Sequence, residues 1–302
     1  MSGKPNKDAE GPVGVAIIDK DVGVTSHDVV GRARRVLGTR KVGHSGTLDP
    51  GATGVLILGV GRATRLLRFL TALPKRYVGH LVLGTETNTL DHEGEVTATH
   101  DMAGVTLAQV QAVAEQFVGD IEQIPPMVSA IKIDGQRLHK LAREGKEVER
   151  PPRPVTIHEL QVTDVDAANG IFSLDVVCSS GTYIRTLAAD IGTALGGGAH
   201  LAHLRRTAIG SFDLEAAHPV EEPVLITPAE ALRDYPRISV DDDTAQLVRY
   251  GRPLPEDLFA EVGAGPWCVF DPAQNLLAVY EVDPERRSAT GVIKPAVVLD
   301  PA

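Results

Sequence analysis

The chain has 302 residues, 43% of them apolar and 23% charged, with a net charge of −10. No apolar run approaches the ~18 residues of a membrane span, the polar N-terminus lacks the apolar core of a secretory signal, and the two cysteines form no C-x-x-C pair. We therefore expect a cytoplasmic globular protein without a membrane span, disulfide framework or zinc finger, preceded by a disordered tail over residues 1–12.

The first quarter of the chain alternates strands and helices. Residues 14–20 predict a buried strand, and Thr25 or Ser26 is placed to cap a helix over residues 27–37. A glycine-rich loop, KVGHSGTLDPGATGV, then leads into a second buried strand. Residues 62–73 have the pattern of an amphipathic helix, and residues 75–84 alternate like a strand that carries Tyr77.

This part of the chain is basic although the whole is acidic. Residues 25–85 carry ten lysines and arginines against two acids, Asp28 and Asp49, whereas residues 213–302 carry 17 acids against 7 bases. Because salt screens charges beyond about 8–10 Å, a local basic field attracts phosphates whatever the net charge of the molecule is. The distribution favours a polyanionic partner over a set of merely solvated helix faces.

The remainder predicts an α+β fold with a largely antiparallel sheet. A helix is expected at 106–118, and a basic segment at 124–153 reads as a short strand, a helix and an exposed arm. Two strands at 155–165 and 171–178 precede a helix within 181–195. Beyond residue 210, short strands and turns predict a small β-rich domain over residues 236–302.

A serine hydrolase is one chemical alternative for the glycine-rich loop. His44, Ser45 and Asp49 are the right residue types, but the loop lacks the G-x-S-x-G turn that exposes the nucleophile. Adjacent His44 and Ser45 also cannot easily form the required hydrogen bond, since the base usually comes from a distant segment.

Metal and nucleotide cofactors are only weakly supported by the sequence. His200 and His203 are expected on a helix face and the three acids at 241–243 in a solvated turn, because neither set has partners at a known ligand spacing. The segment GVGRAT at 59–64 is only part of a phosphate-binding motif. We expect no cofactor.

Asp49 is the remaining candidate for chemistry. Pro50 keeps it out of a helix, and the neighbouring glycines allow a ligand close to the backbone. Nearby arginines predict a lowered pKa and an ionised carboxylate. Two roles are open on this pattern: a nucleophile or base acting on a bound nucleotide, or an Asx-turn aspartate that braces its own loop.

Several segments together resemble the TruB family of tRNA pseudouridine synthases. They include GHSGTLDPGATGVLILGVGRATR around Asp49, KRY at 75–77, GDIEQIPPMVSAIKIDGQRL at 119–138, CSSGTYIRTLAADIG at 178–192 and GAHLAHLRRTAIGSF at 198–212. The tail is similar to the small RNA-binding PUA domain that ends many of these enzymes. The resemblance implies a pseudouridine synthase domain over 13–235, whose 124–153 arm contacts RNA, and a PUA-like domain over 236–302.

The implied reaction isomerises uridine 55 in the T-loop of tRNA, after base flipping and without cofactor or metal. The resemblance assigns the catalytic carboxylate to Asp49, acting as nucleophile or base. It implies that the protein works as a monomer on the T-arm, without an obligate protein partner. A non-catalytic RNA-binding protein or tRNA-folding chaperone on the same scaffold is the alternative.

The resemblance also assigns substrate contacts. His44 is expected to fill the gap left by the flipped nucleotide or to stack in the T-loop, and Tyr77 to stack on the uracil. Tyr183 is expected on the other side of the pocket, and Arg185 as the partner of Asp49. Leu204 is expected to contact the base through its backbone. Val128 and His139 stand where many relatives have tyrosines, which is a departure within the arm.

Overall fold

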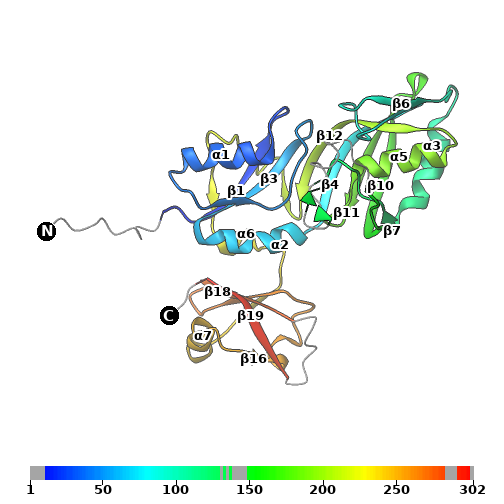
Figure 1. Cartoon of the computed structure of the whole chain (residues 1–302). Helices are drawn as coiled ribbons and strands as arrows, with labels where there is room; N and C mark the ends of the chain where they lie inside the picture. The colour runs from blue at the N-terminus through cyan, green and yellow to red at the C-terminus, as the bar shows by residue number, and fades with distance from the viewer. Residues whose placement is uncertain (1–10, 130–131, 134–135, 138–147, 283–290, 300–302) are drawn as a thin grey trace.

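The computed structural model describes residues 11–129, 132–133, 136–137, 148–282 and 291–299, which form a large mixed domain and a small β-rich one (Figure 1). In spatial order, the large sheet contains β14 (Leu225–Ile226), β1 (Gly14–Lys20), β3 (Thr53–Val60), β12 (Ala199–Ile209), β4 (Lys75–Leu83), β11 (Ile171–Cys178), β10 (Arg153–Asp166) and β7 (Gly119–Gln123), with β2 (Val42–His44) on β3 and β13 (Phe212–Asp213) on β12. Its strands pair antiparallel except for β3 with β12. The predicted fold class is confirmed.

Helices cover both faces of the β1–β3 half because its strands are apolar on both sides. Ala16 and Ile18 point toward α1 (Ser26–Val36), whereas Val15 and Ile17 point toward the 3₁₀ turn η1 (Gly61–Leu66) and α2 (Leu67–Ala72). The short helix α6 (Pro228–Ala231) adds to this second face.

The other half of the sheet packs against two further helices. These are α3 (Leu107–Ala114), extended by η2 (Glu115–Phe117), and α5 (Ile184–Ala194). The remaining short elements are β5 (Thr85–Thr87), β6 (Val96–Thr99), β8 (Lys132–Ile133), β9 (Gln136–Arg137) and η3 (Ala167–Asn169). Across the described ranges, no helix has the length and apolar character needed to cross a membrane.

The small domain is built on a five-stranded sheet. Its strand order is β15 (Arg237–Ser239), β17 (Trp267–Phe270), β18 (Leu276–Glu281), β19 (Val292–Val298) and β16 (Leu254–Pro255), accompanied by α7 (Asp242–Arg249) and η4 (Glu256–Phe259). It lies below α2 in Figure 1, on the side of the large sheet opposite α1.

The two domains share one hydrophobic core. Leu66 and Leu70 belong to the same buried cluster as Phe270 and Leu276 of the small domain. Polar contacts surround it, since Arg65 Nη1 donates to the Val298 carbonyl at 2.8 Å and Arg68 pairs with Glu281 at 2.8 Å. These two arginines of the basic segment therefore contact the small domain directly.

Three local expectations differ from the structure. The helix predicted at 62–73 begins as η1, because no side chain caps it at Val60 and the Thr64 hydroxyl donates to the Gly61 carbonyl. His200 and His203 lie on strand β12, not on a helix. Asp241, expected in a solvated turn, caps the N-terminus of α7 by accepting from the Thr244 amide at 2.8 Å.

Parts of two further expectations lie outside the described residues. These are the tail at residues 1–10 and the centre of the 124–153 arm, including His139.

Candidate active site

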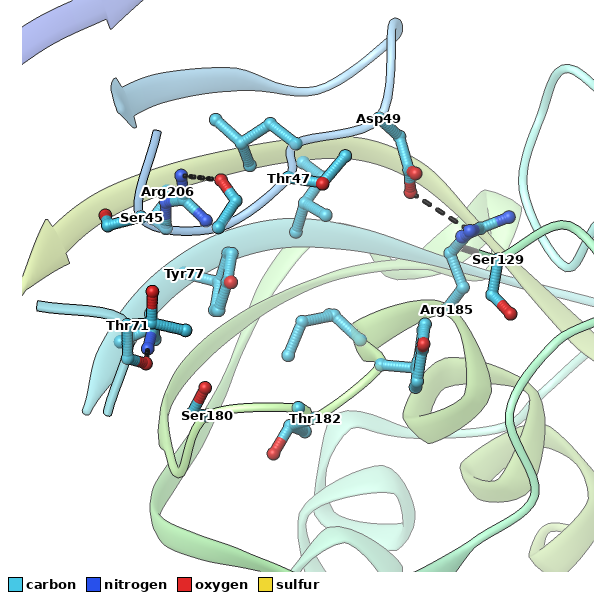
Figure 2. A pocket seen from close by; sticks show the side chains of 17 residues that line it. Ser45, Thr47, Asp49, Thr71, Tyr77, Ser129, Ser180, Thr182, Arg185 and Arg206 are labelled. Carbon is cyan, nitrogen blue, oxygen red and sulfur yellow. Dashed lines mark hydrogen bonds and ion pairs between the residues drawn. The ribbon is translucent and has the colours of Figure 1, made fainter. Parts of the chain in front are cut away.

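A cleft of about 270 Å³ opens where the two halves of the large sheet meet (Figure 2). Its walls come from the glycine-rich loop, β4, β12 and the start of α5. It brings together five of the six residues singled out from the sequence: Asp49, Tyr77, Tyr183, Arg185 and Leu204. Segments more than 150 positions apart in the chain thus build one site.

The loop that carries Asp49 is fixed from both sides. The Ser26 hydroxyl accepts from the Leu48 amide at 2.9 Å and donates to the Leu48 carbonyl at 3.1 Å. The buried Lys20 ammonium donates to the Ala52 carbonyl at 2.6 Å. Gly54 has φ +103°, and a Cβ there would lie 2.1 Å from the Arg206 carbonyl oxygen, so only glycine lets the loop pass β12.

The Asp49 carboxylate is partly exposed and has a charged partner. It is 43% exposed, and Arg185 Nη2 lies 3.1 Å from its Oδ2. Within the described part of the chain, no backbone amide donates to this carboxylate, so the Asx-turn alternative does not hold. Desolvation of the carboxylate by the surrounding protein raises the pKa of Asp49. The charge of Arg185 opposes this shift, and the charge of Asp91 adds to it. The lowered pKa expected from the basic segment is therefore wrong, since desolvation outweighs the cation.

Arg185 is the buried centre of a charge network. Its side chain is 6% exposed, and it pairs with Asp49 through Nη2 and with Asp91 through Nη1, each at 3.1 Å. The same guanidinium donates to the Thr89 carbonyl at 3.0 Å and to the Val128 carbonyl at 2.9 Å. A planar donor held at four points orients one carboxylate with little freedom.

Two tyrosines and a leucine line the cleft beside this network. Tyr77 projects from β4, and burial raises the pKa of its phenol. Tyr183 precedes α5, where its amide donates to Gln123 Oε1 at 2.9 Å, and burial raises its pKa as well. Leu204 follows an irregularity in β12 and lies opposite Gly79 of β4.

His44 does not line the cleft. It ends β2, its ring meets that of His27 edge-on at 5.6 Å, and its Nδ1 accepts from the Gly46 amide. Burial lowers its pKa, and His27 adds to this shift. His44 therefore has no bond to Ser45 of the kind that a hydrolase needs.

Several polar residues of the site were not singled out from the sequence. Asp91 comes from a segment interpreted as an acidic turn, and nothing local links it to Arg185. Lys75 and Arg206 also line the cleft, and both are buried. For Lys75 and Arg206, the sequence signal that could have identified them was a charged residue within an apolar strand pattern. Among the described residues, no cluster of three or more histidine, cysteine or acidic side chains could hold a metal.

The architecture is that of the pseudouridine synthases. The chain superposes on the crystal structure of a Cbf5–Nop10–Gar1 complex with a TM-score of 0.72 and 25% identity, covering 96% of this chain and 85% of that one. A second crystal structure, of the archaeal box H/ACA sRNP Nop10–Cbf5 complex, gives a TM-score of 0.69 at 25% identity, covering 99% and 89%.

The sequence defines the family within this class. Residues 34–184 match the model of the TruB family pseudouridylate synthase N-terminal domain, and residues 185–233 match the tRNA pseudouridylate synthase B C-terminal domain. The chain is 45% identical to tRNA pseudouridine synthase B of Rhodococcus jostii, covering 98% of both chains. It is 47% identical to the protein of the same name from Syntrophotalea carbinolica, covering 82% of this chain and 84% of that protein. The chain belongs to the TruB family.

Proposed function

We propose that the chain converts uridine 55 in the T-loop of tRNA to pseudouridine and that Asp49 supplies the reacting carboxylate. The activity follows from family membership at 45% identity over almost the full length: the chain is a tRNA pseudouridine synthase. The assignment of individual residues rests on the geometry of the cleft.

The observation that carries this assignment is the position of Asp49. It is the one acidic residue among the described side chains that line the cleft, whose lining also includes the cations Lys75, Arg185 and Arg206. Its carboxylate is partly exposed and turned toward Arg185 (Figure 2). It can therefore reach the ribose, where it would either bond to C1′ or remove the C2′ proton.

The neighbouring side chains suit a flipped base. Tyr77 offers a ring for stacking on the uracil, Tyr183 closes the opposite side, and the backbone at Leu204 can hydrogen-bond to the base. His44 lies outside the cleft and is available to the RNA around it. Flipping costs a few kcal/mol, which phosphate contacts must offset. A group of exposed basic residues at the end of α1 is suited to this role: Arg34, Arg35, Arg40 and Lys41.

The assignment is tested by Asp49→Asn and Asp49→Ala with an unmodified tRNA transcript. Both variants should lose at least ~10³-fold in single-turnover rate while still binding tRNA, because only the reacting group is removed. Pseudouridine is mapped at single-nucleotide resolution, and Ser45→Ala serves to test the hydrolase alternative. Product formation by Asp49→Asn at the wild-type rate would refute the role of Asp49. Complete inactivity of Ser45→Ala would revive the serine mechanism.

Three further assignments belong to the same proposal. The β-rich domain at 236–302 is PUA-like and adds to RNA contact, and residues 13–235 form the catalytic domain. The protein is expected to act as a monomer. It works in the cytoplasm, where tRNA is modified.

A further inference from the structure

The end of the cleft away from Asp49 is cationic and has no counter-ion among the described residues. Lys75 is 5% exposed and Arg206 is 1% exposed. Lys75 donates to the carbonyls of Thr71 and Leu73, and Arg206 donates to those of Val55 and Gly46. Among the residues that the structure describes, neither Lys75 nor Arg206 pairs with a carboxylate. Two neighbouring buried charges without an acid are costly, which indicates that an anion meets them during function.

A third polar group points to the same place. The Ser45 hydroxyl is fully buried, lines the cleft and has no hydrogen-bond partner among the described residues. Figure 2 places Ser45 beside Arg206, across Tyr77 from the Asp49–Arg185 pair. A buried hydroxyl is rarely left unpaired, so this one has a hydrogen bond to donate at this end of the cleft.

Strand geometry places both cations around Tyr77. Lys75 precedes Tyr77 by two positions in β4, and alternate residues of a strand share a face. Arg206 of β12 is the cross-strand partner of Tyr77. A base stacked on the Tyr77 ring therefore has its edge next to Lys75 and Arg206.

The reaction generates an anion at this position. When the N1–C1′ bond breaks, its electron pair stays on N1 and uracil leaves as an anion, with charge shared by the ring carbonyl oxygens. The sugar is meanwhile bonded to Asp49 or has given it the C2′ proton. As C5 bonds to C1′, the bond between C1′ and Asp49 breaks or, on the other route, Asp49 returns the proton to C2′. C5 then loses its proton and N1 gains one, so the overall change is an isomerisation.

We propose that Lys75, together with Arg206 and the Ser45 hydroxyl, stabilises the departing uracil anion. Lys75 has three N–H groups, and two of them donate to carbonyls of the protein, which leaves one for the base. Preorganised donors aimed at developing charge in a water-poor site are among the largest contributions to catalysis. This inference rests on the proposed function, because it places uracil on Tyr77.

The structural alternative is that Lys75 only caps the end of α2 through the Thr71 and Leu73 carbonyls. Changing the leaving group distinguishes this structural role of Lys75 from stabilisation of the uracil anion. A fluorine at C5 makes the uracil anion intrinsically more stable, so loss of an anion-stabilising cation matters less for 5-fluorouridine. Loss of a structural contact slows both substrates equally.

The experiment measures single-turnover cleavage of the glycosidic bond with enzyme in excess, on tRNA carrying uridine or 5-fluorouridine at the target position. Lys75→Met should slow the uridine substrate by ~10²-fold and the fluorinated one by ~10-fold or less. tRNA affinity should stay within about threefold of wild type, since the base is reached only after binding. Arg76→Met is the matched control and should leave both rates unchanged, because Arg76 follows Lys75 on the other face of β4 and pairs with Asp175.

A second measurement covers the case in which Lys75→Met does not fold. Burial lowers the pKa of Lys75 to about 8, and Arg206 adds to this shift, so the ammonium charge and the rate should fall as pH rises through 8. The other titratable groups facing Lys75 are Cys178, with a pKa raised to about 11, and Tyr77, whose pKa is also raised; neither loses a proton near pH 8. Lys75→Arg keeps its charge and should remove this fall.

Equal slowing of both substrates by Lys75→Met, or a wild-type rate in that variant, overturns the inference. Persistence of the fall near pH 8 in Lys75→Arg does so as well. Failure of the proposed function has a different signature, namely an active Asp49→Asn. An inactive Asp49→Asn with an unimpaired Lys75→Met removes only the role of Lys75.

Discussion

Arg185 orients the Asp49 carboxylate through a shape that lysine does not have. Its guanidinium reaches Asp49, Asp91 and the Val128 carbonyl at once. An ammonium group in its place could satisfy only part of this set, so Arg185→Lys should lower the single-turnover rate by ~10²-fold with a small change in tRNA affinity. Arg205→Lys is the control, because Arg205 pairs with Asp19 outside the cleft. Equal rates for the two variants would contradict the positioning role.

Under the proposed function, the pKa of Asp49 sets the acid side of the pH profile. Burial raises this pKa above its usual value, so the reactive carboxylate and the rate are lost as pH falls through a range above that of an ordinary aspartate. Asp91 adds to the shift as a like charge. Asp91→Asn should therefore lower the pKa of Asp49 and move the acid limb of the single-turnover rate to lower pH. A limb that stays in place or moves upward would show that Asp91 does not act on Asp49.

At the scale of elements, the passage of the glycine-rich loop over β12 depends on one residue. Gly54 combines φ +103° with a Cβ position 2.1 Å from the Arg206 carbonyl oxygen. Gly54→Ala should lower the free energy of unfolding by more than the ~1–3 kcal/mol of backbone strain alone, since β3 and β12 must also separate. Gly23→Ala is the control, because Gly23 has φ +79° with open space around it and suffers strain only. Urea unfolding compares the two, and equal losses would contradict this account.

Local patterns were sufficient to predict most elements of the fold. Strand β1, helix α1 and strands β3, β4, β10 and β11 lie where apolar periodicity and capping residues predict them, because each buries a continuous face. The first turns of the 62–73 segment were mispredicted because 3₁₀ and α turns share the same apolar pattern. The pairing of β3 with β12 could not be predicted, since it is non-local and parallel.

The site shows the same division between local and distant information. Asp49 stood out as a lone acid in a basic, glycine-rich segment, and motif resemblance added Tyr77 and Arg185. The partnership of Arg185 with Asp91 depends on the contact between α5 and the loop after β5, which no local pattern encodes. The direction of the pKa shift of Asp49 was missed because burial, unlike charge, cannot be counted along a sequence.

At the scale of the whole molecule, the two domains should unfold as one unit. Phe270 of the small domain belongs to the core that also contains β1, β3 and α2, whereas Phe259 belongs to a core within the small domain. Phe270→Ala should cost ~3–5 kcal/mol and lower hydrogen-exchange protection in β1 and β3. Phe259→Ala should lower protection mainly within residues 236–302. Unchanged protection of β1 and β3 in Phe270→Ala would contradict a shared core.

The residues that line the cleft lie between positions 45 and 206. Its two walls meet where β3 pairs with β12, a pairing that we call the β3–β12 seam. Contacts between such distant segments form late in folding, because long stretches of chain must be ordered first. A fragment that ends before β12 lacks the strand that joins β3 to β4, so we expect it not to assemble the cleft. Recovery of catalysis after denaturation therefore reports completion of the seam, and a chain clipped between the two walls and separated into its pieces should be inert.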